Sequence, residues 1–426
     1  MIHGYLAIGG REIKMDQMQK AVDQLTQSGN IMLLVWGAVL VFSMHAGFAF
    51  LEAGSVQRKN VVNALTKIVM DWSVSTFVYF IIGFPIAYGI SFLKPVTDVM
   101  NYDFNFVHFF FLLTFAACIP AIISGGIAER AKFGPQMLAG AILVGLIYPC
   151  YESLIWGQRA VDGTGAAIGL QALLQNNFGA QFHDYAGSVV VHAMGGWIAL
   201  PAIIILGPRL GRYRNNGVSD PPPIHSIPYL ALGSWLLMVG WFGFNVASAG
   251  KLSAISGLVA INSLMAMVGG VIAGCVFSKN DAVAIYNGAL AGLIAVCSGS
   301  DKYHPLAAAV VGAIAAVIFV KAFYFINEKW CLDDVLGVWP LHGLGGAWGG
   351  IAAGIFAIPF FGGLGGVSFM SQLIGTTLCV VIALAGSFVV YYVLNKVTGI
   401  RLSPTEEMTG SDLVVHSSKA YPEELF

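Results

Sequence analysis

Residues 184–196 read DYAGSVVVHAMGG, and residues 334–346 read DVLGVWPLHGLGG. The two stretches share the pattern D-x-x-G-x-x-x-x-H-x-x-G-G, which is five identities at fixed spacing. Each stretch opens an apolar run that is long enough to cross the hydrocarbon core of a membrane. An internal repeat of this kind predicts two related halves, each ending in an equivalent helix.

The composition is that of an integral membrane protein. Of the 426 residues, 57% are hydrophobic and only 10% are charged, against roughly 25% charged in soluble domains. The 21 basic and 22 acidic residues nearly balance, so no nucleic-acid or polyanionic partner is expected. The six cysteines form no CxxC motif and lie mostly in apolar runs, so we expect no disulfide framework, metal site or cofactor.

We expect an all-α membrane protein with eleven spans of about 20 residues each. The predicted spans are 30–52, 63–91, 104–128, 135–156, 185–208, 226–250, 254–277, 282–299, 305–326, 335–358 and 369–396, of which 282–299 is the weakest. Residues 1–29 are predicted to form a polar leader, 30–398 the membrane domain and 399–426 a tail.

Loop charges predict the orientation, because Lys and Arg accumulate in cytoplasmic loops. Loops after odd-numbered spans hold more of these residues than loops after even-numbered spans, which puts the N-terminus outside and the C-terminus in the cytoplasm. Glu52 and Glu129 then lie at cytoplasmic span ends, where we expect ion pairs with the neighbouring Arg58 or Arg130.

Five spans in each half make the repeats inverted, with spans 1–5 related to spans 6–10 and a final helix added. Inverted repeats are typical of transporters and channels, which bind their substrate at the repeat interface. His192 and His342 each lie eight residues, or about 12 Å, into their span. Both imidazoles are therefore expected near the middle of the membrane, where a polar group needs a partner.

Two interpretations of the histidines remain open at this point. They either bond backbone carbonyls and join helices, or they pair with each other and line a narrow path for a small polar solute. Asp184 is a helix cap that could also stabilise a cation near the outer mouth, whereas Asp334 is expected to be a simple cap.

Aromatic side chains form a further cluster in the outer half of the predicted membrane. Phe111 and Phe115 share one helix face. Trp241, Phe244 and Ser248 share another, and Trp156 ends span four. Aromatic faces beside a hydroxyl and an anion suit a small cation.

These motifs resemble the ammonium transporter (Amt/Rh) family, and the Amt branch in particular. The segments that carry the resemblance are GFAFLEAGS at 47–55 with RKN at 58–60, TFA at 114–116 with GIAER at 126–130, DYAGS at 184–188 with His192, GWFGFNVAS at 240–248, and LHG at 341–343. The resemblance extends from about residue 30 to residue 421. It implies an eleven-helix protomer in a homotrimer, with a path through each protomer.

The resemblance also implies roles for individual residues. Phe115, Trp156 and Ser248 match an outer recruitment site for ammonium, with Phe111 and Trp241 alongside. Phe115 and Phe244 match a stacked gate, His192 and His342 match twin histidines of the path, and Asp184 matches an acidic residue near the entrance. Residues 401–421 resemble a cytoplasmic tail that couples protomers, on a face that meets a PII-type signal protein in many bacterial members.

The predicted function is transport of ammonium, and of methylammonium, across the plasma or inner membrane. Ammonium is deprotonated at the gate and crosses as NH3, with net charge movement if its proton follows. The alternative is an ammonium receptor with little flux, although such relatives usually append a signalling domain. A membrane hydrolase is disfavoured because the chain holds no HExxH motif, so no enzyme is expected.

Overall fold

The computed structural model describes residues 5–8, 11–100, 104–214, 217–252 and 255–421. Parts of the predicted leader (1–4 and 9–10) and of the predicted tail (422–426) lie outside the described residues. A two-stranded antiparallel hairpin, β1 (Tyr5–Ile8) and β2 (Arg11–Lys14), precedes the helices, with Tyr5 opposite Lys14. The rest is helical, which confirms an all-helical membrane domain.

The first half of the chain builds five helical rods. Their elements are α1 (Met15–Ser55), the short η1 (Arg58–Asn60), α2 (Val61–Val78) continued by η2 (Tyr79–Gly83) and α3 (Phe84–Tyr88), α5 (Phe104–Ile127), α6 (Phe133–Ile142) continued by η3 (Leu143–Ile147) and α7 (Tyr148–Ile155), and η4 (Ser188–Ala193) continued by α9 (Met194–Leu206). The short α4 (Val96–Val99) and α8 (Gly169–Phe178) lie in loops.

The second half adds six rods and the tail. Their elements are α10 (Ile227–Ala247), α11 (Ile255–Ser278), α12 (Ala282–Val296), α13 (Pro305–Tyr324) continued by η5 (Phe325–Lys329), η6 (Trp339–Leu344) continued by α14 (Gly345–Phe356), and α15 (Phe369–Val397), with the short η7 (Pro359–Phe361) in a loop. The tail forms α16 (Pro404–Thr409) and α17 (Ser411–His416).

Nine helices in the described part of the chain are long and apolar enough to cross a membrane. The other two rods are shorter and coincide with the eighth and tenth predicted spans. α12 has 15 residues, which agrees with its weak sequence signal, and the tenth is divided between η6 and α14. The chain is therefore a multi-pass membrane protein.

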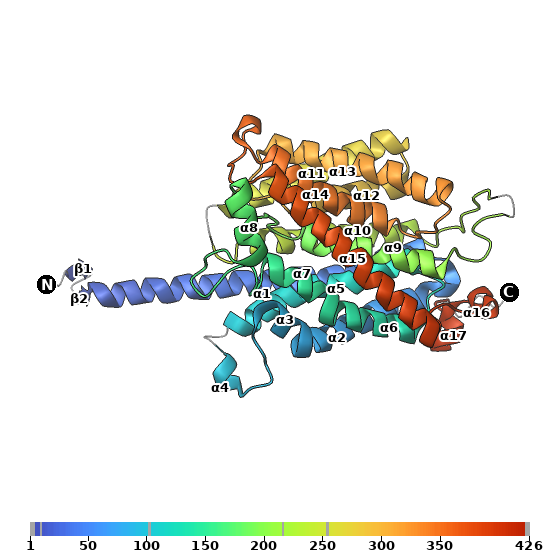
Figure 1. Cartoon of the computed structure of the whole chain (residues 1–426), viewed down its shortest axis with the longest axis horizontal. Coiled ribbons are helices and arrows are strands. Elements are labelled where there is room, and N and C mark those ends of the chain that lie inside the picture. The colour runs from blue at the N-terminus through green and yellow to red at the C-terminus, as the bar shows by residue number, and fades with distance from the viewer. Residues whose placement is uncertain (1–4, 9–10, 101–103, 215–216, 253–254, 422–426) are drawn as a thin grey trace.

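The N- and C-termini lie at opposite ends of the bundle (Figure 1). We call these ends the N-side and the C-side. On the N-side, α1 begins at Met15, inside the predicted polar leader, and extends beyond the bundle as one continuous helix. On the C-side, α16 and α17 lie against η1 and the start of α2.

Glycines allow the backbones of α1 and α10 to pack in close contact. A Cβ atom on Gly233 would lie 2.2 Å from the amide nitrogen of Leu51, and one on Gly54 would lie 2.4 Å from that of Leu230. Such small residues at helix crossings are typical of membrane bundles, where van der Waals contact drives association.

We expect Gly233→Ala to lower the thermal stability of the purified protein, because the backbones of α1 and α10 would have to separate. The loss should be about 1–3 kcal/mol, as for other overpacked interiors. Gly257→Ala on α11 is the matched control, since a Cβ there meets no atom of the described residues within 4 Å. Equal melting temperatures for the two variants would contradict this account of the crossing.

Candidate functional site

The repeated motif builds two helix starts in the middle of the bundle. The Asp184 carboxylate accepts hydrogen bonds from the amides of Val189 and Val190 at 2.9 and 2.7 Å. The Asp334 carboxylate does the same for Val338 and Trp339, at 2.9 Å each. Both predicted caps are therefore present, and each satisfies backbone donors that would otherwise be unpaired.

The glycines of the motif explain why the chain can turn and cross here. Gly187 and Gly337 have φ angles of 94° and 72°, in the left-handed region that favours glycine. A Cβ on Gly196 would lie 2.0 Å from the amide nitrogen of Gly343, and one on Gly346 would lie 2.3 Å from the Ser188 carbonyl. The two half-helices thus cross backbone to backbone.

This crossing brings the two histidines together. His192 and His342 both lie in π-helical turns, η4 and η6, which are rare and occur frequently at functional sites. Their Nδ1 atoms are 3.4 Å apart, and both side chains are buried. Among the described residues, the Nε2 atom of His192 has no hydrogen-bond partner, so this nitrogen remains available to a solute.

Aromatic rings continue from the histidines in both directions. On one side, His192 packs against Phe244 (centroids 5.7 Å apart), and Phe244 packs against Phe115 at 4.4 Å. On the other side, Phe48 lies 6.5 Å from His342. The result is a column in which two imidazoles are enclosed by apolar rings.

A pocket of about 210 Å³ opens on the N-side above Phe115. Four predicted recruitment residues line it: Phe111, Phe115, Trp156 and Ser248. The Ser248 hydroxyl donates to the Phe244 carbonyl at 2.6 Å, so its oxygen lone pairs can still accept from a cation. Such a pocket combines aromatic faces with a hydrogen-bond acceptor.

Trp241 lies elsewhere than in this pocket. It stacks on His192, with centroids 4.9 Å apart, and its Nε1 donates to the Cys297 sulfur at 3.2 Å. The sequence predicted that Trp241 shares a helix face with Phe244 and Ser248. In the structure, Trp241 contacts His192, whereas Ser248, seven residues later on α10, lines the N-side pocket.

Sequence reasoning missed three polar residues that line the same pocket, namely Tyr88, His108 and Tyr185. His108 precedes Phe111 and Phe115 by three and seven positions, so the helical period contained a signal for it. Tyr88 and Tyr185 come from other elements, and no local pattern pointed to them.

Asp184 lies directly below the pocket and does not line it. Trp156 Nε1 donates to the Asp184 carbonyl at 2.8 Å, and the Ser298 hydroxyl donates to its carboxylate at 2.6 Å. Burial raises the pKa of the Asp184 carboxyl, and the hydrogen bonds from Ser298, Val190 and Val189 oppose the rise only in part. Trp156, which lines the pocket, is thus joined to the main chain of Asp184, while the carboxylate is held by Ser298 and by the start of η4.

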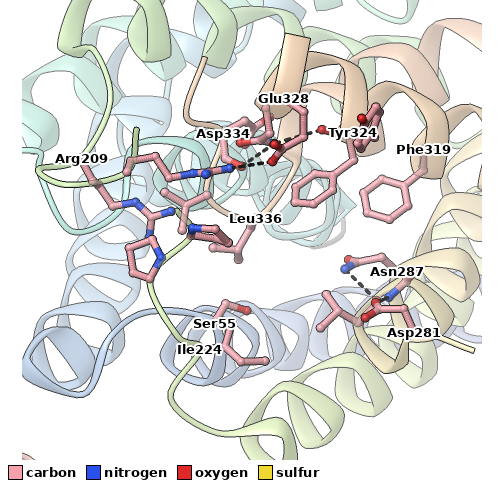
Figure 2. A pocket seen from close by; sticks show the side chains of 18 of the residues that line it. Ser55, Arg209, Ile224, Asp281, Asn287, Phe319, Tyr324, Glu328, Asp334 and Leu336 are labelled. Carbon is pink, nitrogen blue, oxygen red and sulfur yellow. Dashed lines mark hydrogen bonds and ion pairs between the residues drawn. The ribbon is translucent and has the colours of Figure 1, made fainter. Parts of the chain in front are cut away.

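A second pocket, of about 320 Å³, opens on the C-side (Figure 2). Phe319, Tyr324 and Leu336 form an apolar part of its wall, and Arg209 and Glu328 form a charged part. Asp334 also lines this C-side pocket. The second copy of the repeated motif therefore contributes to the C-side pocket, and the first copy contributes Tyr185 to the N-side pocket.

The charged wall depends on one arginine. Arg209 donates to both oxygens of Asp333, at 2.8–2.9 Å, and to Glu129 at 2.8 Å. The expected pairs were wrong: Glu129 binds Arg209 instead of Arg130, and Glu52 binds Lys67 instead of Arg58. Tertiary packing decides these pairs, because Glu129 and Arg209 lie in loops far apart in the sequence and Glu52 and Lys67 lie on the neighbouring helices α1 and α2.

The tail is held on the C-side by its own polar contacts. The Asp412 carboxylate accepts from the amides of Val62 and Asn63, at 3.0 and 2.9 Å. Lys59 donates to the Glu407 carbonyl at 2.9 Å. The tail therefore caps the start of α2.

The family described as Ammonium Transporter Family matches residues 31–421. The ammonium transporter Amt2 of Methanocaldococcus jannaschii is 39% identical over 95% of this chain and 94% of its own length. Amt2 of Archaeoglobus fulgidus is 36% identical over 91% and 88%.

Two solved structures are also similar. A sensor Amt protein superposes with a TM-score of 0.82 and 30% identity, over 92% of this chain and 99% of its own. Mep2 of Candida albicans has a TM-score of 0.75 at 22% identity, over 89% and 87% of the two chains. The second likeness shows the fold alone.

We expect Asp333→Asn to destabilise the protein at pH 7 by roughly 3 kcal/mol, because Arg209 and Arg212 lose a buried partner. Burial acts to raise the pKa of the Asp333 carboxyl, but Arg209 outweighs it and holds the pKa well below the ordinary 3.8. A carboxyl whose pKa is lower in the folded than in the unfolded protein stabilises the fold at pH values above its unfolded pKa. This stabilisation is lost as the pH falls towards the folded pKa.

The difference in melting temperature between Asp333→Asn and the unsubstituted protein should therefore be full at pH 7 and shrink only below about pH 4. Asp220→Asn is the control, since its pair with Arg214 is exposed and worth little. A difference that stayed constant down to pH 2.5 or so would contradict the assignment.

Proposed function

The chain belongs to the ammonium transporter family, and on that premise we propose that it moves ammonium through the column between the N-side and C-side pockets. The observation that carries this proposal is the buried contact between His192 and His342, which is enclosed by aromatic rings. One pocket lies on the N-side above Phe115 and another lies on the C-side. Proteins of this family are transporters and not enzymes.

The proposed layout is eleven spans, with spans 1–5 and 6–10 as inverted repeats and a final helix, the N-side outside and the C-side in the cytoplasm. The matching Asp–Gly–His starts of η4 and η6 support the repeat. Residues 30–398 form the transport domain in this proposal. A homotrimer in the plasma or inner membrane, and a PII-type partner on the C-side, are further parts of it.

Ammonium binds first in the N-side pocket. Phe111, Phe115 and Trp156 offer aromatic faces, and Ser248 offers a lone pair. An intact ion would lose its hydration in the apolar column, which costs several kcal/mol. NH3 is neutral, so deprotonation above the Phe115–Phe244 gate removes most of this cost.

Asp184 supports the deprotonation from below the pocket. It holds the start of η4, and with it His192, and it holds Trp156 through its carbonyl. Its negative charge lowers the energy of a cation in the pocket. NH3 then passes His192 and His342, whose ring nitrogens replace hydrogen bonds that it made in water.

The second candidate is a receptor that binds ammonium without appreciable flux. The likeness to a sensor Amt protein favours it, whereas the two archaeal relatives are named transporters. Measuring flux beside binding distinguishes the two functions, because a transporter shows both and a receptor shows binding without appreciable flux.

An ammonium jump on proteoliposomes should give a saturable current on a solid-supported membrane and none with K+. Asp184→Ala should reduce the current at least about tenfold, because the helix start and the nearby anion are both lost. Asp162→Ala in an exposed N-side loop is the control. Binding of ammonium without current or internal alkalinisation would favour the receptor.

His192→Ala and His342→Ala should each change selectivity or stop transport, since a cavity replaces one of two hydrogen-bonding rings. Methylammonium uptake and the ratio of ammonium to K+ current measure this change. Flux and selectivity equal to those of the unsubstituted protein in both variants would refute the role of the pair.

A further inference from the structure

A second line of polar residues crosses the bundle, away from the histidines. Every fourth residue of α2 is polar and faces the interior: Asn63, Lys67, Asp71 and Ser75, followed by Tyr79 at the start of η2. Residues four apart share a helix face, and this run covers about 24 Å of the helix axis at 1.5 Å per residue. We call it the α2 stripe. Ionisable groups buried in a membrane are costly and usually functional.

The stripe begins at the N-side pocket. Tyr79, Tyr88 and Tyr148 all donate their hydroxyls to the Glu152 carboxylate, at 2.8, 3.1 and 3.3 Å. Tyr88 also lines the pocket in which ammonium is proposed to bind. A hydrogen-bonded connection therefore leads from this pocket through Glu152 to Tyr79.

The stripe ends at the C-side surface. Lys67 forms an ion pair with Glu52, which also accepts a hydrogen bond from Ser124. Lys67 and Gln136 line a narrow cleft of about 10 Å³ that extends to Lys132. That volume holds about one water molecule.

Several polar atoms between these ends have no partner in the part of the chain that the structure describes. They are Asp71 Oδ2, Ser75 Oγ and Gln136 Nε2, in side chains that are 2%, 1% and 5% exposed. Buried polar atoms without partners in a folded protein mark the places of ordered water. These atoms therefore have the unused hydrogen-bonding capacity that a bound water molecule needs.

The charges of the stripe leave room for one proton. Glu52 and Asp71 are two carboxyls that share a single cation, Lys67. Other titratable groups face the stripe: Tyr391 donates to Gln136, and His45 packs on Trp72. Lys132 and Glu129, which is paired with Arg209, line the cleft beside Lys67, and Asp412 and His416 contact Asn63. One carboxylate in excess of the cation can bind and release a proton.

We propose that the α2 stripe is a water-assisted proton path, separate from the histidine column that carries NH3. The proposal rests on the proposed function, since the proton comes from ammonium in the N-side pocket. One N–H bond of NH4+ breaks, its proton joins a water beside Tyr88, and successive O–H bonds form and break through Glu152, Tyr79 and Asp71. A proton leaves beside Lys67 and recombines with NH3 on the C-side.

The test measures charge and NH3 separately in proteoliposomes. Asp71→Asn should lower the ammonium-driven current by about tenfold or more, as expected for a lost proton-transfer group, while internal alkalinisation by NH3 continues. Asp71→Glu keeps the carboxyl and should restore the current. Thr76→Val is the matched control on α2, because the Thr76 hydroxyl bonds its own helix at Trp72 and lies off the stripe.

If Asp71→Asn does not fold, Ser75→Val decides, since it changes no charge and displaces the water proposed beside Ser75. An unchanged current in a folded Asp71→Asn or Ser75→Val protein overturns the proposal and leaves the proton to the histidine column. Loss of alkalinisation together with current overturns it as well, because the two paths would not be separate. Absence of both signals in the unsubstituted protein refutes the proposed function itself.

Discussion

Two buried carboxylates hold the centre of this protein together. In a membrane, a broken helix is tolerated only where other groups satisfy its free amides. Asp184 and Asp334 do this for η4 and η6, and so permit two short helices to start inside the bundle. The contact of the histidines and the close packing of Gly196 on Gly343 both depend on those starts.

Much of this centre could be predicted from the sequence, because the motif is local. The caps at Asp184 and Asp334, and the similar depth of His192 and His342, follow from helical geometry and repeated spacing. The contact between the two rings was one of two interpretations that the sequence left open. The hydropathy pattern gave the order of the helices, including the short α12.

The partners of charged loop residues could not be predicted in the same way. Glu129 finds Arg209, 80 residues away, and Glu52 finds Lys67 on another helix. Such pairs depend on how the loops fold over the C-side, which no local pattern encodes. The polar positions on α2 recur every four residues, yet they resemble an ordinary amphipathic face until the structure places Glu152 and Gln136 beside them.

The contact between the two Nδ1 atoms has a consequence for what can pass. Only one hydrogen can lie between them, so when both rings are neutral one carries its own on Nδ1 and the other on Nε2. The two outward nitrogens are therefore always unlike: one offers a hydrogen and the other a lone pair. NH3 complements this asymmetric pair at both positions, whereas a bare metal cation has no hydrogen to give and meets one nitrogen that repels it. In the proposed path, the tautomeric order of the two rings would thus act as a filter that needs no change in pore width.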